Sequence, residues 1–405
     1  MGYLGTDERD KSVSLIGQRV TVLGAGVAGL AVARALALRG ARVTVLEQAD
    51  AVREVGAGLQ VSPNAAAVLK ALGLGGALEA ASLRADAVEL RDGLTGRVVT
   101  RLEVARLRPD QGYHFVHRAD LIGLLLNGAE AAGVEVRLMA HVRAIDLSGP
   151  RPTFTLDQGA EPADLLIGAD GLHSLTRAAL NGAVAPFFTG QVAWRALIAG
   201  DGGPNVAEVH MAPGRHLVSY PLRGGQLRNI VAVEARQVWA PESWSQRDDP
   251  AHLRAAFASF CPRVNQWLDQ VEDVWLWGLF RHDVAKVWQK PMAEGGVAIL
   301  GDAAHPSLPF LAQGAAMALE DAWVLSASLA ATDGLAAGLA AFEAARKPRC
   351  IRIVAAAEAN ARAYHLSGAL RHVAHLGLRI GGRLAPDYAL QRFDWLYGHD
   401  VTRSG

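Results

Sequence analysis

Residues Arg19–Glu47 read RVTVLGAGVAGLAVARALALRGARVTVLE, and this stretch decides the fold. The apolar, β-branched run Val20–Leu23 predicts a buried strand, the Ala- and Leu-rich run Val27–Leu38 a helix, and Arg42–Leu46 a second strand. Strand, helix and strand in so short a stretch form one right-handed crossover unit, which implies parallel strands covered by helices on both faces. The chain therefore opens as an α/β protein.

A glycine-rich turn, Gly24-Ala25-Gly26-Val27-Ala28-Gly29, joins the first strand to the helix. Gly24 permits a tight turn, Gly26 lets the backbone approach a pyrophosphate, and Gly29 lets helix and strand pack closely. Free N–H groups at the start of the helix favour phosphate binding. Glu47 ends the next strand, where its carboxylate can accept hydrogen bonds from a ribose. The pattern predicts a dinucleotide site, with an ordinary packing turn as the alternative.

Related patterns recur along the chain. A helix and strand are predicted over Asp120–Leu138, and the buried runs Leu165–Ile167 and Val297–Leu300 both end in glycine. Alternating segments replace helices over residues 187–277, which predicts a separate antiparallel sheet. After Ala315 the sequence is strongly helical.

Charge and cysteine content exclude several classes of function. The chain has 40 Lys and Arg against 40 Asp and Glu, so no broad cationic field favours nucleic acid. Cys261 and Cys350 cannot form a disulfide framework and lack neighbours spaced for zinc, so we expect no metal site. Residues 1–18 do not resemble a secretion signal, and no apolar run is long enough for an integral membrane segment. These features predict a cytoplasmic protein.

Two later motifs also place glycine after a buried strand. Gly168-Ala169-Asp170-Gly171 is followed by Ser174 and Arg177, and Gly301-Asp302 comes late in the chain. With the first glycine turn, these motifs resemble the class A flavoprotein aromatic hydroxylases, which have the p-hydroxybenzoate hydroxylase fold. The resemblance covers most of the chain and points to the branch of salicylate, 6-hydroxynicotinate and 3-hydroxybenzoate hydroxylases.

This resemblance implies a fold that is α/β in class and α+β overall. A Rossmann-like FAD-binding domain would carry an inserted antiparallel-sheet substrate domain and a helical C-terminal region. We assign residues 1–75, 100–185 and 280–345 to the FAD-binding domain, 76–99 and 186–279 to the substrate domain, and 346–405 to the C-terminal helices. The resemblance implies FAD as the resident cofactor and NADH or NADPH as a transient reductant, and the lack of a second glycine-rich unit in the sequence fits this.

The resemblance also implies which residues contact the cofactor. The ADP half of FAD would lie against the first glycine turn and Glu47, and its ribityl or pyrophosphate region against Asp302. Asp170 and Gly171 lie where the family serves both FAD and the nicotinamide cofactor. The full predicted set is Gly24, Gly26, Gly29, Glu47, Arg118, Asp170, Gly171, Asp302, Pro309, Gln313, Gly314 and Ala315.

The turn Ala312-Gln313-Gly314 precedes a helix that is expected to begin at Ala315. The family usually has Gly-Gln-Gly here, so this chain is one glycine short. Free N–H groups at the helix start can stabilise negative charge on the N1/C2=O edge of a reduced flavin. A simple helix start, with Gly314 for clearance, is the alternative.

The segment His216-Leu217-Val218-Ser219-Tyr220-Pro221 is predicted to carry the catalytic side chains. In a strand, His216 and Tyr220 project from the same face. Their spacing is similar to that of the 6-hydroxynicotinate hydroxylases, in which these side chains act at the substrate. A histidine suits removal of the substrate hydroxyl proton, since a phenolate is the better nucleophile. Alternatively, His216 is a satisfied polar group on a sheet.

Two positions depart from that branch. Gln60 stands where a histidine is expected and Ala207 where a cysteine is expected, so hydroxynicotinate is left open as the substrate. Arg195 either binds a substrate carboxylate or pairs with an acid. The predicted substrate site consists of Gln60, Arg195, His216, Tyr220 and Pro309.

The predicted activity is FAD-dependent hydroxylation of a phenolic aromatic compound, with a hydroxy-aromatic acid expected. The resemblance implies NAD(P)H as reductant, with NADH expected, and O₂ reacting through a C4a-hydroperoxyflavin. The alternatives are hydroxylation of a prenylated phenol in quinone biosynthesis, or flavin binding without oxygen transfer.

The C-terminal helices are a possible homodimer contact. His365, His372 and His375 would form one stripe if their helix were continuous. We expect such a stripe to face solvent or a second subunit.

Overall fold

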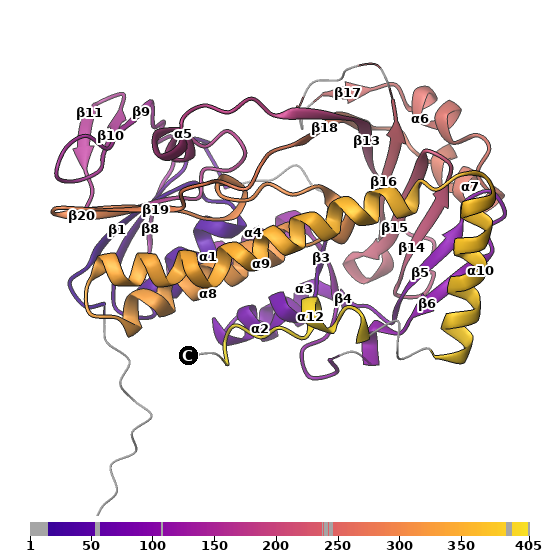
Figure 1. Cartoon of the computed structure of the whole chain (residues 1–405), viewed down its shortest axis with the longest axis horizontal. Helices are drawn as coiled ribbons and strands as arrows, with labels where there is room; N and C mark the ends of the chain where they lie inside the picture. The colour runs from indigo at the N-terminus through magenta and orange to yellow at the C-terminus, as the bar shows by residue number, and fades with distance from the viewer. Residues whose placement is uncertain are drawn as a thin grey trace, which may run out of the picture.

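The computed structural model describes residues 15–52, 57–106, 108–236, 238, 242, 246–385 and 391–403. Figure 1 shows two large sheets, one at each end of the molecule, with a long helix running from one toward the other. Most of residues 1–18, which were expected not to form a secretion signal, lie outside the described residues. Among the described helices, none combines the length and hydropathy needed to cross a bilayer.

The first sheet has six strands and contains the predicted crossover unit. Five strands are parallel and the edge strand β19 is antiparallel. The order is β19 (Gln289–Met292), β20 (Gly295–Ile299), β12 (Leu165–Gly168), β1 (Arg19–Leu23), β2 (Arg42–Leu46) and β8 (Glu135–Arg137).

Helices cover the first sheet and form a common core with it. Val22 of β1, Leu30 of the first helix and Val45 of β2 are fully buried in this core. The packed helices are α1 (Val27–Ala37), α4 (Arg118–Ala131) and α8 (Gly314–Ala331). This arrangement confirms the predicted Rossmann-like unit.

The second sheet has eight strands and confirms the predicted antiparallel sheet. Only the pairing of β14 with β5 is parallel. The order is β17 (Arg247–Asp248), β18 (Val274–Arg281), β13 (Phe187–Ala199), β16 (Leu227–Ala235), β15 (Arg215–Leu222), β14 (Val206–Ala212), β5 (Ala87–Asp92) and β6 (Val98–Leu102). The domain boundary placed at residue 99 therefore falls inside β6.

Short helices cover one face of this sheet. Trp194 and Leu217 from the sheet pack with Phe257 under α6 (Pro250–Phe257) and α7 (Pro262–Asp269). Because side chains alternate along a strand, the neighbours of Trp194 and Leu217 point the opposite way.

Two smaller sheets and several short helices complete the fold. One three-stranded sheet is β3 (Gly58–Val61), β7 (His114–His117) and β4 (Ser82–Arg84), and another is β11 (Gly159–Pro162), β10 (Thr153–Leu156) and β9 (Ala144–Asp146). The remaining short helices are α2 (Pro63–Ala71), α3 (Gly75–Ala81), α5 (Leu175–Asn181), η1 (Val104–Arg106), η2 (Arg223–Gly225), η3 (Gly301–Ala303) and η4 (Pro309–Leu311).

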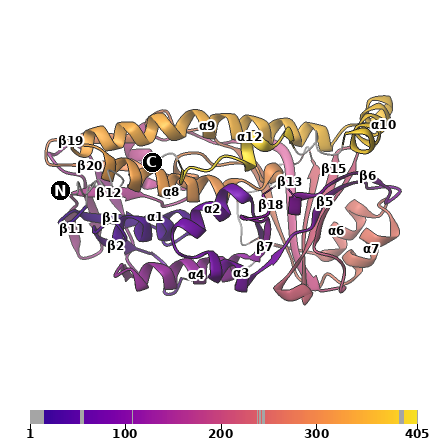
Figure 2. The same cartoon turned by 90° about the horizontal axis from the view of Figure 1, so that it is seen from below.

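Within the described residues, three helices follow α8 at the C-terminal end. They are α9 (Leu335–Tyr364), α10 (Gly368–Leu384) and α12 (Asp394–Tyr397). The 30 residues of α9 span about 45 Å, and Figure 2 shows this helix reaching from the first sheet to the second. The expectation of one histidine stripe is wrong, because α9 ends at Tyr364 and a separate helix carries His372 and His375.

Candidate active site

The first glycine turn has the geometry of a phosphate-binding turn. Gly24 has φ +96°, and a Cβ on Gly29 would lie 1.9 Å from the Gly24 carbonyl oxygen. A Cβ on Gly26 would meet no protein atom within 4 Å. The first hydrogen bond of α1 runs from Leu30 N to Gly26 O, and no side chain caps the helix. The start of α1 therefore presents N–H groups to open space, as a pyrophosphate requires.

Glu47 lies beside this turn at the end of β2. Its Oε2 accepts a hydrogen bond from Ala25 N at 2.8 Å, and its Oε1 accepts one from Ala49 N at 2.9 Å. The two backbone contacts fix the carboxylate while leaving it partly exposed. Glu47 is thus held in the position expected for a ribose contact.

Gly26 and Gly29 are expected to respond differently to alanine. In Gly26→Ala the new methyl group meets open space, so folding is preserved while one phosphate hydrogen bond is lost. Charge-assisted hydrogen bonds contribute about 1.5–3 kcal/mol each, so FAD affinity should fall about 10- to 100-fold in a fluorescence titration. Gly29→Ala is the matched comparison: its methyl group would clash with backbone, so thermal unfolding should reveal a folding defect. Wild-type FAD affinity in Gly26→Ala would contradict the phosphate assignment.

A second helix start lies at the N-terminal end of α8. The side chain of Gln313 is buried, donates from Nε2 to Ser62 Oγ at 2.9 Å, and accepts from Asn64 Nδ2 at 3.2 Å. No side chain caps α8, whose first backbone bond runs from Met317 N to Gln313 O. Gln313 thus anchors the turn, and the first N–H groups of α8, including those of Gly314 and Ala315, are left for another acceptor. This geometry agrees both with stabilisation of negative charge on a reduced flavin and with a simple helix start.

Ala312 takes the left-handed conformation at the same turn, with φ +52°. Glycine adopts this conformation without a steric penalty, whereas other residues usually pay about 1–2 kcal/mol. The backbone therefore keeps the shape that a glycine would favour, although the chain has alanine there.

Asp302 and Arg118 bring opposite charges to the region between the two helix starts. Asp302 is exposed on η3 after β20, and Arg118 begins α4 after β7. Burial lowers the pKa of Arg118, while the charge of Asp302 acts in the opposite direction. Pro309 begins η4 and is also exposed. Asp302 and Arg118 thus supply polar groups, and Pro309 supplies an apolar ring, where the predicted cofactor would lie.

Asp170 is engaged by its own loop. Its Oδ1 accepts from Ser174 Oγ at 2.5 Å, and its Oδ2 accepts from Thr176 N and Oγ1 at 3.1 Å. Gly171 has φ +73° in the turn that follows. Arg177 donates to the carbonyls of residues 303 and 304 and so ties this loop to the Asp302 turn. A cofactor contact by Asp170 and Gly171 stays a prediction.

A buried ion network behind η3 was not predicted from the sequence. Asp321 accepts from Arg346 Nε at 2.8 Å and lies 2.5 Å from His305 Nε2, while Arg346 Nη1 is 2.6 Å from Glu320 Oε2. Asp321 also accepts from the backbone N of Gly301 at 3.1 Å. The sequence feature that could have indicated this network is the pair of adjacent acids Glu320-Asp321 within a predicted apolar helix. The network fixes the turn that carries Asp302.

The same network contains the one group of described residues whose spacing suits a metal, His305, Asp321 and Cys350. The guanidinium of Arg346 already pairs with Asp321 and reaches Cys350 Sγ at 3.5 Å. A metal cation there would be repelled by Arg346, so these residues form an ion-pair cluster.

The strand predicted to carry the catalytic side chains is β15, and His216 and Tyr220 share one face of it as expected. His216 and Tyr220 are both buried on the side away from α6 and α7. The His216 ring lies 5.5 Å from the ring of Phe310, which follows Pro309 in η4. The Tyr220 ring stacks on Phe115 at 5.0 Å. This strand therefore meets the segments expected to hold the flavin.

Gln60 and Arg195 converge on Tyr220. Burial raises the pKa of Tyr220, whereas Arg195 and a hydrogen bond with Gln60 lower it. Gln60 Oε1 also accepts from Tyr113 Oη at 2.7 Å. The guanidinium of Arg195 lies 4.7 Å from the Trp277 ring, and burial with the repulsion of Arg118 lowers its pKa to about 10. A cation and an amide, both partly exposed, thus lie beside a buried phenol.

Burial and the neighbouring His365 hold the pKa of His216 well below its usual range. His216 is therefore neutral near pH 7, with a lone pair available on one ring nitrogen. A neutral imidazole is the form that accepts a proton.

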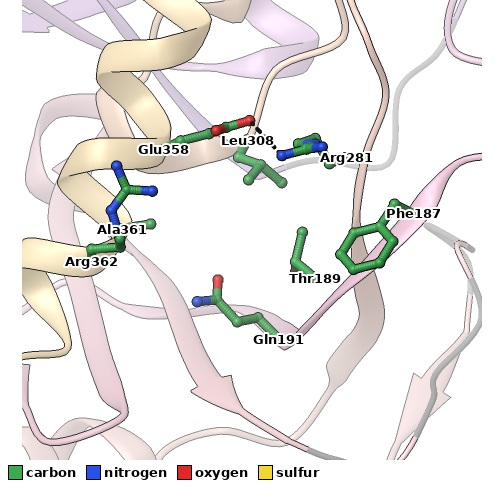
Figure 3. A pocket seen from close by; sticks show the side chains of 8 residues that line it. All are labelled: Phe187, Thr189, Gln191, Arg281, Leu308, Glu358, Ala361 and Arg362. Atoms are coloured by element: carbon green, nitrogen blue, oxygen red, sulfur yellow. Dashed lines mark ion pairs between the residues drawn. The ribbon is translucent and has the colours of Figure 1, made fainter.

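A hollow of about 190 Å³ lies between β13, β18 and α9, and Figure 3 shows the side chains that line it. Arg281 and Glu358 lie 3.8 Å apart at its wall, and Leu308 connects it to the η4 turn. Its lining residues are Phe187, Thr189, Gln191, Arg281, Leu308, Glu358, Ala361 and Arg362. Ala361 packs in one cluster with Phe310 and Tyr364, both of which contact the His216 ring, so the hollow lies near His216.

Comparison with known proteins identifies the family of the chain. The family described as FAD binding domain matches residues 18–357. The 3-amino-4-hydroxybenzoate 2-monooxygenase PtmB3 of Streptomyces platensis is 35% identical over 398 residues, covering 96% of this chain and 97% of that protein. The 3-hydroxybenzoate 6-hydroxylase of Polaromonas naphthalenivorans is 34% identical, with 94% and 96% covered.

A solved structure agrees with these relatives. HpxO of Klebsiella pneumoniae, complexed with FAD and uric acid, superposes with a TM-score of 0.79 at 25% identity. The match covers 91% of this chain and 94% of that chain. The uncapped starts of α1 and α8, the space beside Gly26 and the facing charges of Arg118 and Asp302 fit an FAD molecule. The chain belongs to the FAD-binding family and, within it, to the class A flavoprotein hydroxylases.

Proposed function

We propose that this flavin-dependent monooxygenase hydroxylates a small phenolic aromatic acid with NAD(P)H and O₂. The observation that carries the proposal is the convergence of Arg195, Gln60, Tyr220 and His216 on the sheet face that meets η4. Two relatives act, by their names, on hydroxybenzoates, which supports the same substrate class here.

FAD, when bound, supplies the activation of O₂. The start of α1 would hold its pyrophosphate, Glu47 its ribose, and Asp302 with Arg118 its central part. The N–H groups at the start of α8 would face the flavin edge that gains negative charge, and the anchored Gln313 side chain keeps this turn fixed.

The protein would position and activate the phenol. Arg195 supplies positive charge for a carboxylate or a phenolate, and Gln60 and Tyr220 supply hydrogen bonds. Neutral His216 accepts the hydroxyl proton, which leaves the electron pair on the substrate oxygen and makes the ring more nucleophilic. The aromatic side chains around these groups keep water away from the reacting atoms.

The two alternative functions, hydroxylation of a prenylated phenol and flavin binding without oxygen transfer, receive no support from the relatives described above. The relatives described above are named for small aromatic acids, so a prenylated phenol is not favoured, and flavin binding without oxygen transfer does not explain the substrate face. NADH as the preferred reductant stays a prediction, because Glu47 would contact FAD. Cys261 and Cys350 are both free, in accord with a cytoplasmic location.

A homodimer is also proposed, through the outer side of α10. Leu370, Val373, Leu376 and Leu384 are 56–82% exposed there, and exposed apolar patches commonly mark subunit contacts. A monomeric mass in sedimentation equilibrium would exclude this contact.

The test of the function is a panel of phenolic acids. We expect the purified yellow protein to oxidise NAD(P)H faster with its substrate, and mass spectrometry to find one added oxygen atom in the product. Prenylated phenols serve as the comparison set. Stimulated oxidation that yields only hydrogen peroxide with every phenol would contradict the proposal.

A further inference from the structure

His216 has a histidine partner from another part of the chain. Its Nδ1 lies 2.8 Å from Nε2 of His365, the residue that follows the last turn of α9. One of these two nitrogens must carry a hydrogen atom and the other must accept it. Since Nδ1 is engaged in this way, the opposite nitrogen of His216, Nε2, is left to interact with a substrate.

The surroundings of His216 do not stabilise a positive charge. Its ring contacts are Phe310, Tyr364 and His365, and the strand partners across from it are Met211 and Val233. The charge of His365 lowers the pKa of His216, and Tyr364 is a further ionisable side chain in contact with its ring. The nearby Arg215 and Glu234 pair with each other at 3.0 Å.

If His216 takes a proton from a substrate, a second group must therefore accept a proton from His216. An imidazolium without a counter-charge is disfavoured at a fully buried position such as His216. His365 is only partly buried, and its backbone oxygen accepts from Gly214 N in the β14–β15 hairpin at 3.4 Å. The pair thus runs from the buried face of β15 toward the surface.

We propose that His365 is a positioning residue that relays the substrate proton from His216 to solvent. This inference rests on the proposed function. The substrate O–H bond breaks and its proton binds His216 Nε2, while the proton on His216 Nδ1 moves to His365 Nε2. His365 then releases its Nδ1 proton to water, and the substrate oxygen keeps the electron pair. One proton enters the pair and one leaves it, and the reverse transfer to the phenolate product restores both tautomers.

The relay is tested by two variants of His365. In His365→Gln the amide can still bond His216 Nδ1 but cannot pass on a proton, and in His365→Ala added imidazole can replace the missing ring. We expect hydroxylation at neutral pH to fall about 10- to 100-fold in both. Imidazole should restore the alanine variant, and higher pH should restore the glutamine variant. Flavin content and the rate of flavin reduction should match those of the wild type.

A proton-transfer measurement separates this proposal from the proposed function. 3-Hydroxy-4-nitrobenzoate becomes more strongly coloured on ionisation, so stopped-flow absorbance reports loss of its proton without NAD(P)H or O₂. We expect the wild-type holoenzyme to ionise the bound probe, and His365→Gln to do so at least tenfold more slowly. Unchanged ionisation and hydroxylation in His365→Gln, or no ionisation by the wild type, would overturn the relay. Ionisation without any hydroxylated product would instead refute the proposed function alone.

Discussion

Replacing His216 by alanine is expected to lower the hydroxylation rate about 10²- to 10⁴-fold, the range of general acid–base contributions. The substrate would keep its proton in this variant, so its ring would remain a poor nucleophile. FAD should bind normally, because the glycine turn of α1 and the start of α8 do not depend on His216. Stopped-flow measurement of the oxygen-dependent step, with flavin content measured in parallel, gives the result.

Val218→Ala provides the matched control for this prediction. Val218 lies between His216 and Tyr220 on the same face of β15 and carries no ionisable group. Its truncation disturbs packing at the same strand without removing the base. Equal losses of hydroxylation in the two variants, or a parallel loss of FAD from His216→Ala, would assign His216 a structural role.

Replacing Arg346 by methionine should destabilise the protein by about 3–5 kcal/mol, the cost of breaking a buried ion network. Glu320 and Asp321 are fully buried and would lose a shared cation, while the methionine chain fills much of the same volume. Asp321 also holds the backbone of Gly301, so FAD should bind less tightly. Urea unfolding of the apo and FAD-bound forms measures both effects.

Arg143→Met is the matched control, since Arg143 pairs with Asp157 at 2.9 Å on the surface. The two side chains are 60% and 55% exposed, so water and salt already weaken the pair. We expect a far smaller change in the free energy of unfolding than in Arg346→Met. Similar stability of the two variants would show that the buried network contributes little.

The local features of the fold were predictable from the sequence. The first crossover unit depends on short-range patterns of apolar residues, on the positive φ of Gly24, and on the close approach of Gly29 to the Gly24 carbonyl oxygen. Alternation along β15 was enough to place His216 and Tyr220 on one face, because strand geometry fixes this for neighbouring residues. The Gln313 turn was likewise recognisable before a helix.

The sequence alone determined the α/β class, the position of the first glycine turn and the shared face of His216 and Tyr220. The tertiary structure decided which distant residues complete the site. His365 lies 149 positions from His216, and Gln60 meets Tyr113 from 53 positions away. The sequence analysis also did not predict the break between α9 and α10, which places His365 beside His216 and away from His372 and His375. Such contacts depend on how sheets and helices pack, and packing joins residues that no local pattern relates.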